Sequence, residues 1–262
     1  NNPLSPLLDE PHSAISVSLT GPVIENNSYL DACKRGIPQQ LKSACVSAAG
    51  CNVVVENDVI CWAKGALSYL KIKSQPLQFP CLGITLGTGV GVVLMKDEYS
   101  FVGIELSFID CPFTHLKPLT SDQAMPRWSS HSALGEKFFG WLLQEKSVTE
   151  EQLPFSPPHL AHYNARFQAF TKDICDYVKS TFSVTVSSLI VGGGNSRFIE
   201  ALNDLPLPTH ILSPNALKKE GIVPDSIQLL GCKSSSDEHH APSQLYPSID
   251  EMAKRLNERR YN

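Results

Sequence analysis

Residues 81–95, CLGITLGTGVGVVLM, place two apolar runs on either side of a turn in which Gly87, Gly89 and Gly91 alternate with other residues. Each run has the length of a buried strand, so we predict a hairpin. Alternate glycines let backbone N–H groups converge on an anion, and Thr88 can add a hydroxyl donor. Neither a phosphate-binding lysine nor a helix follows, which excludes the G-x-x-x-x-G-K-[ST] and dinucleotide-binding patterns. The turn suits a phosphate, or it is an ordinary hairpin connection.

The composition is that of a globular protein. The chain has 262 residues, enough for one large domain or two lobes, and 42% of them are hydrophobic and 18% charged. The net charge of −4 argues against nucleic acid and against an anionic membrane surface as partners. No apolar run approaches the ~18 to 20 residues that a membrane span requires. Binding to polyanions or insertion into a membrane is therefore not expected.

Eight cysteines are scattered singly along the chain, with no C-x-x-C pair to place two ligands on one metal. We therefore predict free thiols, several of them buried, and no metal site. Thiols that stay reduced indicate a reducing compartment. Because no signal-like segment is present either, the expected location is the cytoplasm.

Strand and helix patterns alternate along the chain. The predicted strands lie at residues 14–19, 52–55, 101–108, 187–191 and 208–212, besides the hairpin. The predicted helices lie at residues 39–48, 58–70, 132–144, 161–181, 197–202, 224–230 and 248–260. A proline-bearing loop is expected at 153–159, and Gly231 is expected to end the helix before it. Such alternation predicts an α/β fold with largely parallel sheets.

Three polar residues, Glu56, Asn57 and Asp58, stand where the second predicted strand gives way to the helix at 58–70. A carboxylate at such a junction faces the cleft above an open α/β sheet, where ligands bind. Asp58 is suited to accept a proton from a substrate hydroxyl as a general base. The alternative is that this position only caps the helix, as Asn and Asp commonly do.

A second glycine cluster, Gly192, Gly193 and Gly194, follows the strand at 187–191 and precedes Asn195. Backbone without side chains lets a flat or charged ligand approach closely. A tight loop is the alternative interpretation of this cluster, which taken alone says little about function.

The order and spacing of these three motifs resemble the ROK family of sugar kinases and sugar-responsive repressors, over residues 12–232. The resemblance implies an actin-like, ribonuclease H-like ATPase fold of two lobes, which uses ATP and Mg²⁺. It makes Asp58 the catalytic base and Asn57 a sugar contact. It also implies that residues 87–91 hold phosphate and that residues 192–195 lie against adenosine.

Two further sugar contacts follow from the same resemblance. Residues 16–23, SVSLTGPV, are similar to the family's strand ending in P-G-P-V, which places Gly21 on the sugar side. Glu105, in the sequence G-I-E, resembles a glutamate that contacts the sugar. Ile60 stands where the family has a second asparagine, so one sugar hydrogen bond is expected to be lost. Phe108 or a near neighbour replaces a family histidine, and the cysteine cluster that binds zinc with it is absent, so no zinc is expected.

The family's first phosphate motif, D-x-G-G-T, does not occur in this chain. Residues 1–13 are too few to form it. The strands at 14–19 and 52–55 alone would leave the N-terminal lobe incomplete, because a two-stranded sheet has open edges and little face to bury. We expect an upstream segment, a partner or a rearrangement to complete the lobe.

These observations predict an organisation and a function. We expect an N-terminal lobe at residues 1–80, a nucleotide lobe at 81–232, and a polar linker with a terminal helix at 233–262, which acts as a contact between copies or as a lid. The expected activity is ATP-dependent phosphorylation of a hexose or N-acetylhexosamine hydroxyl, as in glucokinases or N-acetylmannosamine kinases. The alternatives are an inactive sugar or nucleotide sensor and a chain that retains only the fold. A DNA-binding repressor is disfavoured by the negative charge and the lack of a preceding helix-turn-helix.

Overall fold

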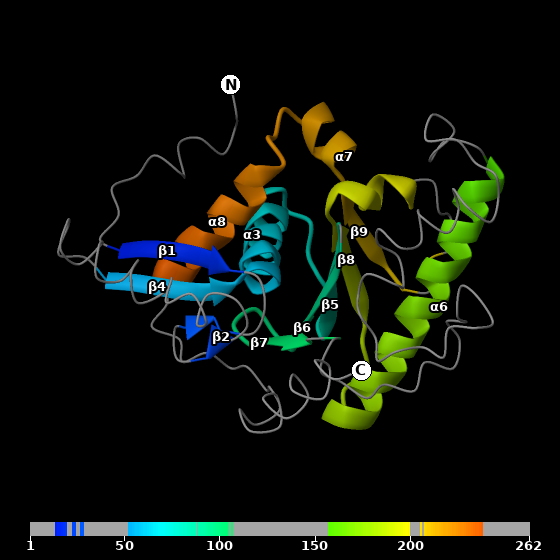
Figure 1. Ribbon diagram of the computed structural model, residues 1–262, viewed down its shortest axis with the longest axis horizontal. Coiled ribbons are helices and arrows are strands. Elements are labelled where there is room, and N and C mark those ends of the chain that lie inside the picture. The colour runs from blue at the N-terminus through cyan, green and yellow to red at the C-terminus, as the bar shows by residue number, and fades with distance from the viewer. Residues whose placement is uncertain are drawn as a thin grey trace, which may run out of the picture.

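The computed structural model describes residues 14–19, 23–24, 27–28, 52–87, 89–104, 106, 157–199, 205 and 207–237. The strands in these residues are β1 (Ala14–Leu19), β2 (Val23–Ile24), β3 (Asn27–Ser28), β4 (Asn52–Asn57), β5 (Cys81–Leu86), β6 (Val90–Met95), β7 (Phe101–Ile104), β8 (Ser188–Gly192) and β9 (Thr209–Leu212). The helices are α3 (Asp58–Ile72), α6 (Pro157–Phe182), α7 (Pro214–Lys219) and α8 (Asp225–Asp237), with a 3₁₀ helix, η3 (Gly194–Phe198). Figure 1 shows their arrangement.

The centre of the described structure is a five-stranded sheet in the order β7-β6-β5-β8-β9. The hairpin predicted at residues 81–95 is confirmed, because β5 and β6 pair in antiparallel register from Cys81 opposite Met95 to Leu86 opposite Val90. β7 is also antiparallel to β6, whereas β8 and β9 continue the sheet in parallel from β5. The sheet is therefore mixed, and the prediction of largely parallel sheets is wrong for the hairpin half, where short turns reverse the chain.

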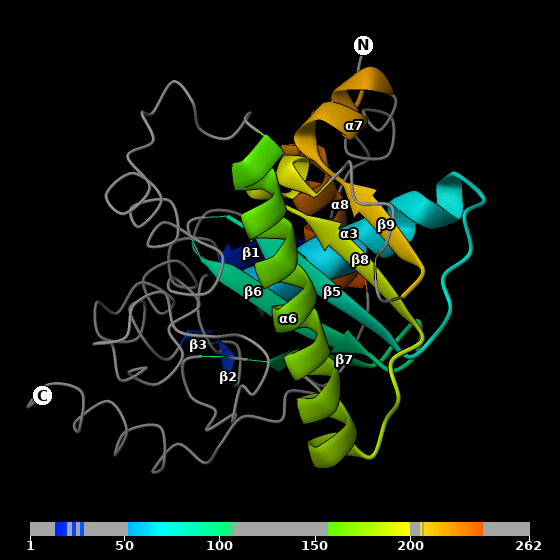
Figure 2. The ribbon, with the colours of Figure 1, turned by 90° about the vertical axis from the view of Figure 1, so that its right-hand side faces the viewer.

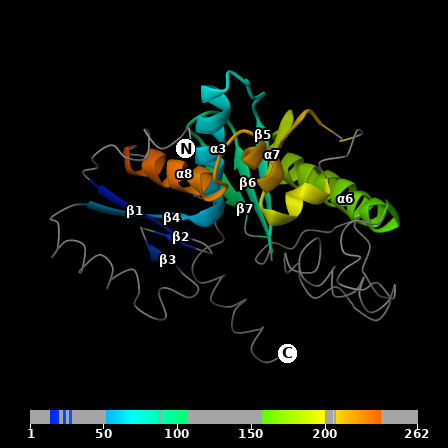
Figure 3. The ribbon, with the colours of Figure 1, turned by 90° about the horizontal axis from the view of Figure 1, so that it is seen from above.

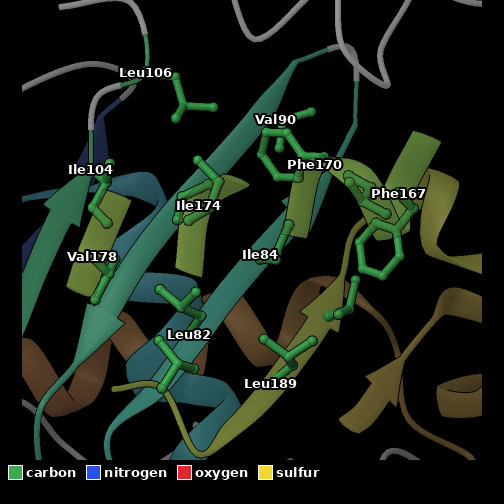
Figure 4. Packing of buried hydrophobic residues seen from close by; sticks show 14 of the residues in the cluster. Leu82, Ile84, Val90, Ile104, Leu106, Phe167, Phe170, Ile174, Val178 and Leu189 are labelled. Atoms are coloured by element: carbon green, nitrogen blue, oxygen red, sulfur yellow. The ribbon is translucent and has the colours of Figure 1, made fainter. Parts of the chain in front are cut away.

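Helices cover both faces of this sheet. α6 lies on one face and α3 with α8 on the other, as Figures 1 and 2 show from two directions. Side chains alternate between the faces of β5: Leu82 and Ile84 pack toward α6, while Cys81 packs toward α3. Figure 4 shows Leu82, Ile84 and Leu189 gathered beneath Phe167, Phe170, Ile174 and Val178 of α6. Each fully buried side chain of this kind stabilises the fold by about 1.5–3 kcal/mol relative to an exposed one.

α3 and α8 touch each other backbone to backbone. A Cβ added at Gly65 of α3 would lie 1.8 Å from the carbonyl oxygen of Ile227, and one at Gly231 of α8 would lie 1.6 Å from that of Cys61. The prediction that Gly231 ends its helix is wrong, since α8 continues through it to Asp237. The physical reason is that this glycine lacks a side chain so that the two helices can meet.

A smaller group of strands lies beside α8. β1 and β4 form a parallel pair in which Ser18 is opposite Glu56 and Leu19 opposite Asn57, and β2 and β3 form a separate antiparallel pair. Seen from above in Figure 3, β1 and β4 run along α8, which contacts both. This pair carries the chain directly into α3.

The other predicted elements agree with the structure to differing degrees. The strand at 14–19 is β1, and the helix at 58–70 is α3, which extends two residues further. α6 begins inside the predicted loop, because prolines such as Pro157 are tolerated in the first turn of a helix. A 3₁₀ helix replaces the helix start predicted at 197, β7 ends at Ile104, and α7 was not predicted. The helices predicted at 39–48, 132–144 and 248–260 lie outside the described residues.

Candidate active site

The carboxyl end of β4 turns directly into α3 at Asn57 and Asp58. Asn57 is the N-cap, with φ −64° and ψ 141°. Its Oδ1 accepts hydrogen bonds from the backbone N–H of Val59 at 2.9 Å and of Ile60 at 3.2 Å. The residue that caps the helix is therefore Asn57, which is 2% exposed, and not Asp58.

Asp58 is the first residue inside the helix and is half-buried. One of its carboxylate oxygens accepts the Val59 N–H at 2.9 Å, which fixes the side chain against the first turn. A carboxylate in this position also interacts favourably with the positive end of the helix dipole. Because Asn57 already caps the helix, Asp58 is not required for that purpose and is suited to a chemical role.

A buried ion pair supports this turn from behind. Glu56 accepts the backbone N–H of Asn57 at 3.0 Å through one oxygen, and its other oxygen lies 3.5 Å from the Nζ of Lys64. Lys64 extends from the second turn of α3, and its ammonium group also lies 5.5 Å from the ring centroid of Phe101. Both members of the pair are nearly buried, so each depends on the other for its charge compensation.

The two glycine clusters lie side by side. The side-chain amide of Asn195 donates to the carbonyl oxygen of Gly87 at 2.9 Å, across 108 residues of sequence. Gly193 has φ +86°, and a Cβ there would lie 2.5 Å from the carbonyl oxygen of Leu86, so glycine is required both for conformation and for space. The structure thus brings together the two motifs that the sequence assigned to phosphate and adenosine.

Not every glycine in these motifs is open to a ligand. A Cβ at Gly194 would meet nothing within 4 Å, and one at Gly87 only the carbonyl oxygen of Gly89 at 3.9 Å. At Gly91, however, a Cβ would lie 2.1 Å from Cγ2 of Val59, and at Gly192 it would lie 2.3 Å from the ring of Trp62. The absence of a side chain at these last two glycines therefore makes room for α3, which rests directly on them.

The contact between Val59 and Gly91 brings the motif at residues 56–58 close to the two glycine clusters. Val59, which packs on Gly91, is the residue that follows Asp58. The Asp58 turn, the residue 87–91 turn and the Gly193 loop consequently meet where β4 enters α3. Gly21, Thr88 and Glu105 lie outside the described residues, so their predicted contacts with sugar or phosphate remain predictions.

The same arrangement of elements occurs in solved sugar kinases. An inorganic polyphosphate/ATP-glucomannokinase from Arthrobacter sp. strain KM matches with a TM-score of 0.51 at 16% identity, over 90% of this chain and 80% of that one. A ROK family protein from Streptococcus pneumoniae TIGR4, in complex with sucrose, matches with a TM-score of 0.53 at 12% identity, over 89% of this chain and 83% of that one. The chain has the fold of the ROK sugar kinases. No protein-family model and no curated sequence matches it.

The ROK fold confirms the actin-like α/β class and the resemblance that the motif order indicated. A cavity of about 600 Å³ is present elsewhere on this fold, between α6 and the residues leading into β8 and β9. It is lined by Thr171, Lys172, Cys175 and Val186, among others, and by none of the predicted site residues. The candidate site of this chain therefore rests on the convergence of the three motifs and not on the cavity.

The described cysteines, Cys61, Cys81, Cys175 and Cys232, are free, as predicted. Burial raises the pKa of the Cys81 thiol and of the Cys175 thiol to about 11 each. Contact with Cys232 and burial raise the pKa of Cys61. Within the described ranges, no three His, Cys, Asp or Glu side chains are grouped to hold a metal ion, and none of the helices could cross a bilayer.

Proposed function

We propose that this protein transfers a phosphoryl group from ATP to a hydroxyl of a hexose or an N-acetylhexosamine. The observation that carries the proposal is the hydrogen bond between Asn195 and Gly87, which joins both glycine motifs next to the helix that starts at Asp58. The Arthrobacter neighbour is named as an ATP-using glucomannokinase, and the Streptococcus neighbour contains sucrose. Both support a sugar and a nucleotide as the small-molecule partners.

The residues take the roles that the motifs predict. Asp58 accepts the proton of the attacking sugar hydroxyl. The backbone of residues 87–91 holds the transferring phosphate, and the exposed backbone at Gly194 lies against the adenosine. Asn57, with Gly21 and Glu105, contacts the sugar.

Mg²⁺ is expected to accompany ATP, where it neutralises phosphate charge. Of the described carboxylates at this junction, Asp58 is assigned to the sugar hydroxyl and Glu56 is turned toward Lys64. The metal would therefore be held mainly by phosphate oxygens and water at the residue 87–91 turn, as is common for a magnesium nucleotide. The residues present therefore fit a metal that arrives with the nucleotide.

Location and lobe organisation form part of the same proposal. The free thiols of the described cysteines support a reducing compartment, and we place the protein in the cytoplasm. We also propose two lobes, at residues 1–80 and 81–232, followed by a terminal segment at 233–262. A cleft that closes on the substrates would depend on this division.

The test is ADP release from ATP and Mg²⁺ with a panel of hexoses and N-acetylhexosamines. Asp58→Asn should lower kcat by about 10²- to 10⁴-fold, the usual contribution of a general base, without changing the thermal midpoint by more than a few degrees. Asp225→Asn is the matched control, because Asp225 is also an acid at the first position of a helix but is exposed. Sugar-dependent stabilisation without ADP release would instead identify a non-catalytic sugar sensor.

A further inference from the structure

The side chain of Gln228, on α8, reaches the turn that carries Asp58. Its Nε2 donates to the backbone carbonyl oxygen of Asp58 at 2.8 Å and to the hydroxyl oxygen of Ser18, on β1, at 2.7 Å. The two acceptors belong to different elements, and Gln228 lies 170 residues from Asp58 in sequence. One amide group therefore ties the end of β1 and the start of α3 to α8.

The chemistry of the contact fixes the orientation of the amide. A backbone carbonyl can only accept, so the nitrogen of Gln228 must face Asp58. A carboxamide nitrogen has two hydrogens, and here they serve Asp58 and Ser18. A glutamate of the same shape would present an oxygen to the Asp58 carbonyl, and an apolar side chain of similar length would offer no donor.

The backbone on both sides of Gln228 is held in place. The carbonyl of Ile227 lies against Gly65, and Gly231, three residues later, lies against the carbonyl of Cys61. Both are close backbone contacts between α8 and α3. Gln228 thus extends from a segment that cannot shift along α3, and its amide occupies a defined position relative to Asp58.

We propose that Gln228 is a positioning residue for the reaction: α8 holds the main chain of Asp58, and with it the direction of the carboxylate, through this amide. The inference rests on the proposed function, because it assigns a support to the proposed base. Gln228 does not need to touch the substrate for this role. Loss of its donor should lower kcat more than it changes KM for either substrate, since the base is displaced while the binding surfaces remain.

The activity test compares four variants. Gln228→Met, which keeps the length without a donor, should lower kcat about three- to tenfold, the range of one lost hydrogen bond, with both KM values within about twofold. Gln228→Glu should lower kcat at least as much. Ser18→Ala keeps the bond to Asp58 and should retain at least about half of kcat, and Leu229→Ala, at the exposed neighbouring position, should be unchanged. Wild-type kcat in Gln228→Met, or equal losses in Gln228→Met and Leu229→Ala, would overturn the proposal.

A second measurement is independent of catalysis. Hydrogen exchange of a peptide spanning residues 56–62 should be about three- to tenfold faster in Gln228→Met than in wild type, and unchanged in Leu229→Ala. Unchanged exchange in Gln228→Met would show that the amide does not hold this turn. If wild type phosphorylates no sugar but exchange responds as expected, the proposed function fails while the structural support stands. Gln228→Asn, too short by one methylene, replaces Gln228→Met if the latter does not fold.

Discussion

Replacing Gly91 by alanine separates a packing role for this glycine from a phosphate-binding role. The added Cβ would lie 2.1 Å from Cγ2 of Val59 and 2.6 Å from the hydroxyl oxygen of Thr85, whereas unstrained carbon contacts are about 3.5–4.0 Å. Forcing an extra methyl into such a position costs about 1–3 kcal/mol. In a chain of this size, that corresponds to a fall of roughly 2–12 °C in the thermal midpoint.

The partner residue supplies the decisive comparison. Val59→Ala removes the nearer of the two obstructing atoms. The double variant Val59→Ala/Gly91→Ala should therefore lose less unfolding free energy than the two single variants lose together, by about 0.5–3 kcal/mol. The assay is thermal and urea unfolding of all four proteins, followed by circular dichroism. Additive effects, or a Gly91→Ala protein as stable as wild type, would refute the packing argument.

Gly87→Ala is the matched control in the same turn. A Cβ at Gly87 would meet only the carbonyl oxygen of Gly89, at 3.9 Å, so stability should change by less than about 0.5 kcal/mol. If this backbone approaches phosphate, the methyl group should instead weaken ATP binding in a calorimetric titration. We therefore expect alanine at position 91 to lower stability and alanine at position 87 to weaken ATP binding.

Three other predictions concern contacts around the same helices. Gly231→Ala should unfold or displace α8 and cost more than Gly91→Ala, because the backbone of α3 cannot retreat as a side chain can; near- and far-ultraviolet circular dichroism would detect this. Lys64→Met should cost about 3–5 kcal/mol by leaving Glu56 buried without its cation, and adding Glu56→Gln should recover most of that loss in urea unfolding. The hydrogen bond from Lys73 lowers the pKa of Glu220, so the stability it provides is present above the unfolded pKa and is lost as pH falls through the folded value. The difference in midpoint between wild type and Glu220→Gln should therefore shrink between pH 7 and pH 3, and should be small throughout because the group is exposed.

Local features of the fold were predictable because local sequence determines them. The hairpin follows from two apolar runs around a glycine turn, and the start of α3 follows from an Asn-Asp pair before a helical pattern. The position of the cap was harder to predict, since Asn57 and Asp58 are both good capping residues. Which of them caps depends on where the extended backbone ends, and this is decided by the pairing of β4 with β1.

Features that depend on a distant partner were not predictable in this way. Gly231 has the residue type of a helix terminus, and only its contact with α3 shows that it belongs inside α8. Gly91 and Gly192 have the pattern of ligand-binding glycines, yet their missing side chains make room for Val59 and Trp62. Gln228 is an unremarkable polar residue in the sequence, because neither of its acceptors is nearby in the chain.

The backbone contact between α3 and α8 has a consequence for synthesis of the chain. Asp58 emerges from the ribosome 170 residues before Gln228, and at about 5–20 residues per second this is an interval of roughly ten to thirty seconds. During this time the face of α3 around Cys61 and Gly65 lacks the helix that covers it in the finished protein. The helix that bears the proposed base therefore reaches its final position only after the last described helix has been made.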